Sequence, residues 1–280
     1  RDYIGCKHAV ALNSCTAGLN LALALQNFPE GDEVITTPMT FPATANVIFL
    51  QRLKPVFADI EPGTLTIDPQ KIEAVITPRT RAIIPVHFAG HPCDMTLIQE
   101  LADKHKLVII EDAAHALESE YKGQKIGNMG NATAFSFYAN KNITTGEGGM
   151  LVTNDDALAE NIRIMRLQGI SRDAWKRFGK SGFAHWEQTL AGHKCNMTDL
   201  NASLGLHQIK KIERFMILRK KYVSMYDNAF ADVPELETLA VRDYVISAHH
   251  IYIIALQLER FTLDRDGFLD AIQSAGIGVA

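Results

Sequence analysis

Lys141 lies where a lysine side chain could react with a carbonyl compound. It follows the apolar run 132–137, and a loop rich in threonine and glycine (144–149) comes soon after it. Ligands of α/β proteins bind outside the carboxyl ends of strands, and an amine that is desolvated there has a lowered pKa and becomes nucleophilic. A solvated loop lysine fits the same pattern, and the segment taken alone favours that plainer interpretation.

Asp112 and His115 form a second pair of chemically useful residues. Asp112 follows the apolar run 107–111, and His115 comes three residues later. A carboxylate at the end of a strand can hold a proton on a heterocyclic nitrogen, or bind a metal ion or a ribose hydroxyl. It can equally cap a helix, and the segment does not choose between these interpretations.

Two more segments follow predicted strands. Residues 13–19 (NSCTAGL) offer hydroxyls and free backbone N–H groups at the start of a helix, which suits a phosphate, although an ordinary Ser/Thr cap explains them as well. The glycine spacing of ATP and NAD sites is missing there. In residues 37–42 (TPMTFP), Phe41 could stack on a planar ligand or belong to the core.

Taken together, these segments predict one cofactor. They supply an amine, a carboxylate, an anion-binding helix start and an aromatic ring, all at the carboxyl ends of predicted strands. A phosphorylated aromatic aldehyde would use each of these groups, and pyridoxal 5'-phosphate (PLP) is such a cofactor.

The elements that must position these residues alternate between strands and helices. The predicted strands cover 8–13, 33–36, 55–59, 82–87, 107–111, 132–137 and 150–153, and the predicted helices cover 16–26, 43–50, 68–76, 95–105 and 156–167. Strands that alternate with helices of this length predict an α/β fold with a mostly parallel sheet flanked by helices on both faces.

The last third of the chain has a different pattern. We expect a long polar loop at 173–194, followed by a long helix at 198–230, a strand at 251–258 and a helix at 266–274. Because Pro234 ends the long helical pattern, we expect a large domain at 1–232 and the start of a smaller C-terminal domain at 233–280. The chain begins at Arg1 and ends without a closing element, so we expect the small domain to be truncated.

The composition narrows the class of protein. Hydrophobic residues make up 47% of the 280 residues, charged residues make up 21%, and the net charge is -4. These values are typical of a soluble globular protein and predict no surface for nucleic acid or an anionic membrane. The four cysteines lack the spacing of metal ligands, so we expect no metal site and a reduced, cytoplasmic protein; they are Cys6, Cys15, Cys93 and Cys195.

Motifs along nearly the whole chain resemble the DegT/StrS family of sugar aminotransferases, which are PLP-dependent enzymes of fold type I. The motifs are GDEVITTPMTF, TPRTRAIIPVHFAGHPCDM, IEDAAHA, YKGQKIGNMG, FSFYANKNITTGEGGMLVT, GHKCNMTDLNASLGLHQIKKIE and SAHHIYIIAL. Within the family, the sequence is most similar to the UDP-4-amino-4-deoxy-L-arabinose aminotransferases. The resemblance implies the type I fold and PLP-dependent amino transfer.

The resemblance also implies three roles around the cofactor ring. Lys141 corresponds to the lysine that bonds covalently to PLP and then acts as general acid and base. Asp112 corresponds to the acid that keeps the pyridine nitrogen protonated. His115 corresponds to the residue that contacts the phenolic oxygen, where many members have glutamine.

Four further residues match cofactor contacts of the family. Thr16 and Ser136 correspond to phosphate contacts, and Phe41 corresponds to the aromatic ring that stacks on the cofactor. Lys194 falls where many members have the asparagine of the motif GYNYRM. That segment reaches the cofactor phosphate of the neighbouring subunit, so the resemblance implies a homodimer with shared active sites.

The implied activity moves an amino group from glutamate to a keto group, expected at C4, of a nucleotide-linked sugar. Three basic residues of the long loop are candidates for binding the nucleotide, although a solvated face explains them as well: Arg172, Lys176 and Arg177. The alternatives are another PLP reaction (a sugar dehydratase, another transaminase or a lyase) and a non-catalytic PLP-binding regulator. Family members that dehydrate sugars carry histidine at the position of Lys141, which argues against a dehydratase.

Overall fold

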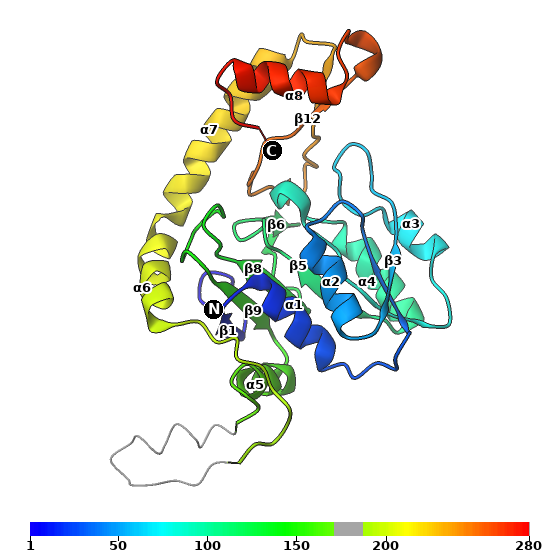
Figure 1. Ribbon diagram of the computed structural model, residues 1–280, viewed down its shortest axis with the longest axis vertical. Helices are drawn as coiled ribbons and strands as arrows, with labels where there is room; N and C mark the ends of the chain where they lie inside the picture. Colours follow the sequence, from blue (N-terminus) through cyan, green and yellow to red (C-terminus); the bar gives the residue numbers. More distant parts are fainter. Residues whose placement is uncertain (171–186, 280) are drawn as a thin grey trace.

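A seven-stranded sheet forms the centre of the molecule (Figure 1). The computed structural model describes residues 1–170 and 187–279. In sheet order, the strands are β1 (His8–Leu12), β9 (Gly149–Thr153), β8 (Ala132–Ser136), β5 (Val108–Asp112), β4 (Thr80–Ile83), β2 (Glu33–Thr36) and β3 (Lys54–Phe57). Neighbours from β8 to β3 pair in parallel, whereas β9 is antiparallel to both β1 and β8.

The helices that cover the two faces of the sheet are α1 (Cys15–Ala24), α2 (Pro42–Leu50), α3 (Pro69–Ala74), α4 (Met95–His105) and α5 (Asp156–Met165). Further along the chain are α6 (Asp199–Gln208), α7 (Ile212–Phe230) and α8 (Arg265–Ser274). Ser14, Asp94 and Asp155 cap α1, α4 and α5, because each side chain accepts a hydrogen bond from a backbone N–H of the first turn. Within the described residues, no helix has the length and apolarity that crossing a membrane requires.

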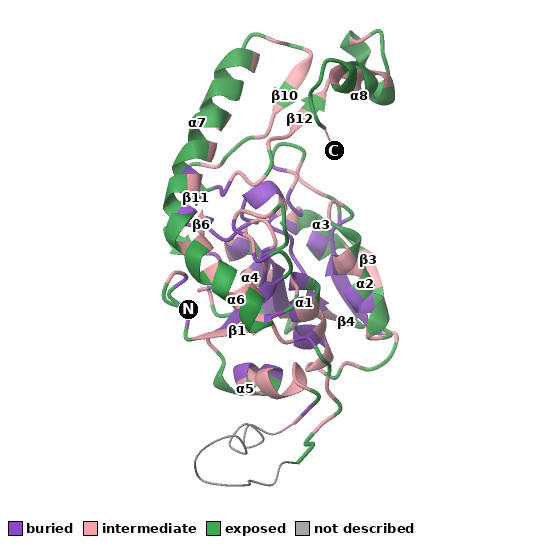
Figure 2. Ribbon diagram, turned by 60° about the vertical axis from the view of Figure 1, so that its left-hand side comes forward, coloured by how far each residue is buried: buried purple, intermediate pink, exposed green. Residues whose placement is uncertain are grey.

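The core consists of two apolar clusters, one on each side of the sheet. Ile109 of β5 and Phe135 of β8 belong to one cluster, whereas the adjacent Ile110 and Ala134 belong to the other. This alternation follows from the period of two residues in a strand. Residues of α1, α2 and α5 complete the second cluster, and residues of α3, α4 and the start of α7 complete the first. Figure 2 shows that the buried residues concentrate in this body.

The chain after α7 leaves the central body and then returns to it. Strands β10 (Leu236–Thr238) and β12 (Ile254–Leu256) pair with each other at the far end of α7. Between them, β11 (Val245–Ile246) pairs with β6 (Glu120–Tyr121) of the central body, and β6 pairs with β7 (Gln124–Lys125). The side chain of Arg242 adds ion pairs with Glu61 and Asp94. A domain boundary at residue 232 stays a prediction.

The predicted α/β class and the mostly parallel sheet are confirmed. The predicted strand at 82–87 is shifted, because β4 ends at Ile83 and Pro85 has no N–H to continue the ladder. The predicted helix at 198–230 is interrupted by a 3-10 turn at Ile209–Lys211. This turn aligns Ile209 with Ile212, and both side chains pack on the first apolar cluster. The short strands β6, β7, β10 and β11 were not predicted.

Candidate active site

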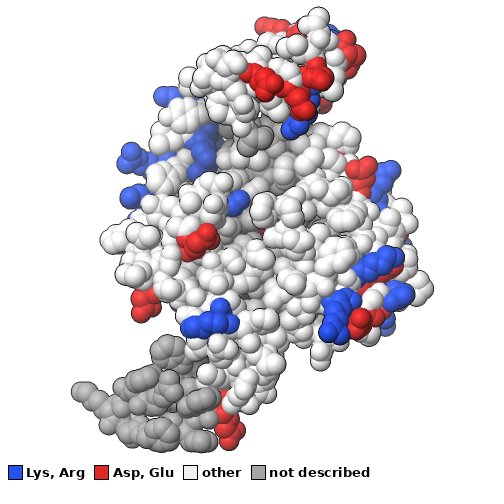
Figure 3. Space-filling model, viewed as in Figure 1, with Lys and Arg blue, Asp and Glu red and all other residues white. Residues whose placement is uncertain are grey.

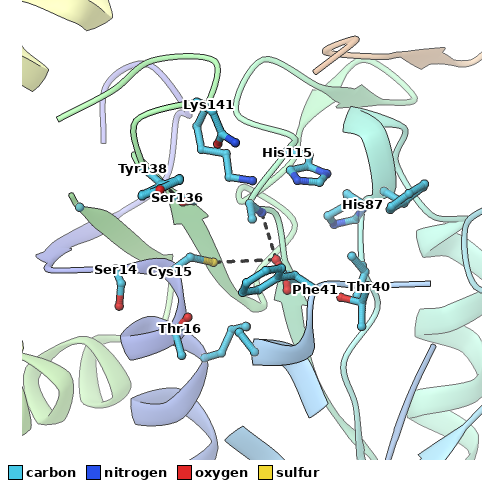
Figure 4. Close-up of a pocket in the computed structure, with 18 of the residues that line it drawn as sticks. Ser14, Cys15, Thr16, Thr40, Phe41, His87, His115, Ser136, Tyr138 and Lys141 are labelled. Atoms are coloured by element: carbon cyan, nitrogen blue, oxygen red, sulfur yellow. Dashed lines mark hydrogen bonds between the residues drawn. The ribbon is translucent and has the colours of Figure 1, made fainter. Parts of the chain in front are cut away.

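A cavity of about 390 Å³ opens at the edge of the sheet where the parallel strands end (Figure 4). Its walls come from the start of α1, the turn between β2 and α2, the segments after β4, β5 and β8, and the residues before β9. Six of the seven site residues expected from the sequence line this cavity: Thr16, Phe41, Asp112, His115, Ser136 and Lys141.

The start of α1 forms one wall, and Gly149 lets it approach β9. A Cβ atom on Gly149 would overlap the backbone carbonyl group of Ser14. Only glycine therefore allows this approach without a shift of the backbone. The hydroxyls of Thr16 and Ser136 lie on the same side of the cavity (Figure 4), and together with the helix N-terminus they suit an anion.

Asp112 lies at the bottom of the cavity with its carboxylate fixed by three donors. Oγ1 of Thr44 donates at 2.7 Å, the backbone N–H of Ala114 donates at 3.1 Å, and Sγ of Cys15 lies 3.8 Å away. Burial, and then the Asp112 charge, raise the pKa of the Cys15 thiol, which keeps it protonated. Within residues 1–170 and 187–279, no lysine or arginine forms an ion pair with Asp112. Its negative charge is therefore left for a cationic N–H group.

Glu111 and His87 form a buried pair beside Asp112. Nε2 of His87 lies 2.9 Å from a Glu111 oxygen, and the backbone N–H of Cys93 donates to Nδ1 of His87 at 3.1 Å. Because Nδ1 accepts a hydrogen bond, the imidazole carries its proton on Nε2 and donates it to Glu111. Both side chains are fully buried, so this pair braces the cavity wall.

Lys141 and His115 enter the cavity with nitrogens that have no partner. Within the described part of the chain, Nζ of Lys141 makes no hydrogen bond or ion pair, and burial lowers its pKa against the opposing effect of Asp112. Nδ1 of His115 is buried and unpartnered. Burial, and then His250 and Lys141, lower the pKa of His115 to about 3, so the imidazole is neutral.

Phe41 is an aromatic ring at the cavity wall and not part of the core. It is 77% exposed although Pro42, the next residue, begins α2. Tyr138 also lines the cavity and is exposed. These rings offer a planar surface to a ligand.

Lys194 lies outside the cavity of its own chain. It is exposed, and its ammonium group donates to Oδ1 of Asn196 at 2.6 Å. The other basic candidates lie outside the described residues: Arg172, Lys176 and Arg177.

Sequence reasoning missed two residues that hold the site together. Thr44 was not singled out, although it lies in the first turn of α2, close to Phe41. Cys15 was noted as part of a phosphate-binding segment and as one of four free cysteines, whereas its thiol faces Asp112.

The residues present fit PLP. Among the described residues, Nδ1 of His115 and Nζ of Lys141 have no partner and are available to a ligand, and Asp112 offers an unpaired charge to a protonated ring nitrogen. The start of α1 offers donors for a phosphate. When bound, PLP supplies an aldehyde that exchanges amines and a ring that accepts an electron pair.

Comparisons with known proteins agree with this chemistry. The chain matches the DegT/DnrJ/EryC1/StrS aminotransferase family over residues 1–280. It is 50% identical over 280 residues to the uncharacterized protein MJ1066 of Methanocaldococcus jannaschii, covering 100% of this chain and 72% of that protein. It is 47% identical over 271 residues to the spore coat polysaccharide biosynthesis protein SpsC of Bacillus subtilis. This match covers 97% of this chain and 70% of that protein.

Solved structures are similar as well. PseC of Helicobacter pylori, an aminotransferase involved in the biosynthesis of pseudoaminic acid, matches with a TM-score of 0.90 and 35% identity over 99% of this chain and 72% of that chain. The PLP form of Spr1654, a sugar aminotransferase by its name, of Streptococcus pneumoniae matches with a TM-score of 0.88 and 33% identity. This match covers 99% of this chain and 73% of that chain. The chain belongs to the DegT/DnrJ/EryC1/StrS family and is a PLP-dependent sugar aminotransferase.

Proposed function

We propose that this enzyme moves an amino group from glutamate to the C4 keto group of a nucleotide-linked sugar. The observation that carries the proposal is the half-buried Lys141, whose Nζ has no partner among the described residues and lies in the same cavity as Asp112. The names of two relatives support a sugar substrate, since one acts in polysaccharide biosynthesis and the other in the biosynthesis of pseudoaminic acid. An arabinose-type substrate stays a prediction.

Lys141 carries two roles in this proposal. Its amine bonds covalently to the cofactor, and after displacement by the donor it takes a proton from the carbon that bears the amino group. A lowered pKa favours both roles, because only the neutral amine is a nucleophile and a base. Lys141 then delivers the proton to the carbon on the other side of the nitrogen, which completes a 1,3-proton shift.

Asp112 and His115 control the cofactor ring in this proposal. Asp112 holds the proton on the pyridine nitrogen, and Thr44 and Ala114 keep its carboxylate oriented. His115 contacts the phenolic oxygen through its unpartnered nitrogen. The ring lies against Phe41.

Thr16 and Ser136 bind the phosphate in this proposal, together with the start of α1. We also propose a homodimer in which Lys194 reaches the cofactor phosphate of the second subunit. The exposure of Lys194 outside its own cavity supports this role. Apolar side chains exposed on α6 support a second subunit: Leu200, Leu204 and Leu206. The free, unpaired state of all four cysteines suits the cytoplasm, which is the location we propose.

The test is the visible absorbance of the purified chain with PLP, before and after glutamate is added. A band that borohydride fixes onto the peptide containing Lys141, and that disappears with glutamate while 2-oxoglutarate forms, supports the proposal. A nucleotide 4-keto sugar should then restore the band. A band that forms on Lys141 but does not respond to glutamate would contradict the donor, and restoration only by a sugar with its keto group elsewhere would contradict C4. No reducible bond at Lys141 would contradict the proposed role of this residue.

A further inference from the structure

Five side chains form a connected row from α7 to the cavity. The row, in order, is Arg219, Glu118, Asn142, His250 and His115. The guanidinium of Arg219 pairs with one oxygen of Glu118, and the Asn142 amide donates to the other oxygen at 2.5 Å. Oδ1 of Asn142 lies 2.6 Å from Nδ1 of His250, and the His250 ring lies against the His115 ring with centroids 4.3 Å apart.

The hydrogen bonds of the row fix which atoms donate and which accept. Glu118 accepts from the NH₂ group of Asn142, so the amide oxygen of Asn142 faces His250. Nδ1 of His250 must therefore carry a proton and donate it. The charged groups that act on His250 are Lys141 and Arg219, and His115 faces its ring. Burial, and then these two positive charges, lower the pKa of His250 to about 4, so its Nε2 is unprotonated at neutral pH.

Two residues of the row, Arg219 and His250, are held by hydrogen bonds to backbone carbonyl oxygens. Glu118 is only 3% exposed, and Nε of Arg219 donates to the carbonyl oxygen of Ala248 at 2.9 Å. The backbone N–H of His250 donates to the carbonyl oxygen of Ala89 at 2.9 Å. The adjacent Gly90 has a φ of +90°, and a Cβ there would lie 2.9 Å from the carbonyl oxygen of His115.

We propose that Asn142 and Glu118 are positioning residues that, through His250, hold Lys141 and His115 in place at the cofactor. Asn142 directly follows Lys141, so fixing its amide at both ends fixes the turn that carries the reactive amine. The same amide holds His250, whose ring packs on His115. The inference rests on the proposed function in one respect, namely that Lys141 is the lysine that bonds to PLP.

The experiment uses holoenzyme of the wild type, Asn142→Ala, Glu118→Gln and the double variant. Three quantities are measured: the pH midpoint of the absorbance change of the cofactor, the rate constant for glutamate and the half-saturating concentration of glutamate. Loss of a residue that orients a catalytic group costs about 10–100-fold. We expect Asn142→Ala to lower the rate constant by that amount, to change the half-saturating concentration by less than about threefold, and to move the pH midpoint.

Glu118→Gln keeps the size of the side chain and tests the row even where Asn142→Ala does not fold. It should move the midpoint in the same direction by a smaller amount, because an amide oxygen can still accept from Asn142. The double variant should lose no more than Asn142→Ala alone, since the residues act as one unit. Asn20→Ala serves as the matched control, because Asn20 accepts a hydrogen bond from Gln51 away from the cavity.

Two results would overturn the inference. One is that both single variants keep the rate constant and the pH midpoint of the wild type. The other is a lowered Tm or PLP content in variants whose remaining holoenzyme keeps the wild-type rate constant and pH midpoint. That result would mean that the residues have a purely structural role. The pH midpoint needs no amino donor, so the row can be tested even where glutamate proves to be the wrong donor. The borohydride experiment on the wild type separately tests the role of Lys141.

Discussion

The central body and the C-terminal elements bury their apolar residues very differently. The inner strands β2, β5 and β8 are almost wholly buried, whereas α6 and α8 contain no buried residue and α7 contains only Ile212 and Met216. Leu200 of α6 is 82% exposed. On the face drawn in Figure 3, charged side chains gather over the C-terminal elements and around the rim of the body.

The two regions are therefore stabilised in different ways. In the central body, helices cover both faces of the sheet and bury its apolar side chains. The cavity is therefore built on a well-packed core. In the described chain, large apolar side chains stay exposed on the C-terminal helices, among them Leu200, Leu204 and Ile217. The pairing of β11 with β6, the ion pairs of Arg242 and the row from Arg219 to His115 connect the second region to the first.

Lys141→Ala should have the largest effect and should be confined to the function of the central body. We expect loss of the borohydride-reducible bond and a fall in turnover on the order of 10³-fold or more, because nucleophile and base are removed together. Tm should change little, since Nζ has no partner within the described residues. Mass spectrometry after borohydride treatment measures the bond. A reducible adduct on the same peptide of the variant would refute the role of Lys141.

Asp112→Asn should have the next largest effect. The amide has nearly the same shape but cannot hold a proton on the ring nitrogen, so we expect turnover to fall by about 10²–10⁴-fold while the covalent bond still forms. Thr44→Val is the companion variant, because it removes the 2.7 Å hydrogen bond and leaves the charge. Its loss should be smaller than that of Asp112→Asn. Near-wild-type transamination by Asp112→Asn would remove this residue from the mechanism.

Ile110→Ala and Leu204→Ala compare the two regions by stability. Ile110 is fully buried, so its truncation should lower the free energy of unfolding by about 2–5 kcal/mol. Leu204 is 54% exposed in this chain, so its truncation should cost less than about 0.5 kcal/mol when a single subunit unfolds. Denaturant unfolding at low and high protein concentration measures both. A cost for Leu204→Ala that grows with protein concentration would show that a second subunit covers α6.

The buried histidines of the site predict a pH dependence of stability. The folded protein holds His115 and His250 with pKa values of about 3 and about 4, below the value of about 6.5 in an unfolded chain. The unfolded state therefore binds more protons, and the stability these residues contribute is present above pH 6.5 and lost as the pH falls toward 4 and then 3. His115→Gln should flatten this fall, as measured by Tm against pH. An unchanged slope would mean that His115 is not held neutral.

Much of the site could be predicted from local patterns. Asp112 and Lys141 follow apolar runs, and parallel strands bring their carboxyl ends to one edge, so an α/β prediction already places these residues together. Phe41 stayed ambiguous, because an aromatic residue after a strand fits both a core and a cavity wall. The family motifs added the roles of Thr16 and Ser136, which their residue types alone do not indicate.

The residues that hold the site could not be predicted, because their partners are distant in sequence. Thr44 and Asp112 are 68 residues apart, and Asn142 and His250 are 108 residues apart. A threonine in a helix and a histidine before a strand have no local pattern that indicates these contacts. The exposure of Leu200 could not be predicted either, since helical spacing shows that a face is apolar but not what covers it.

The sequence by itself determined the α/β class and the cofactor, and it predicted the residues expected to meet that cofactor, because hydrophobic periodicity and motif chemistry are local properties. Tertiary structure alone decided which nitrogens of Lys141 and His115 were left without partners, and how Asp112 was oriented. It also decided that α7 is connected to the cavity through Glu118 and Asn142. These outcomes depend on burial and on hydrogen bonds between distant segments, which come into existence only when the sheet, its helices and the returning C-terminal segment pack together.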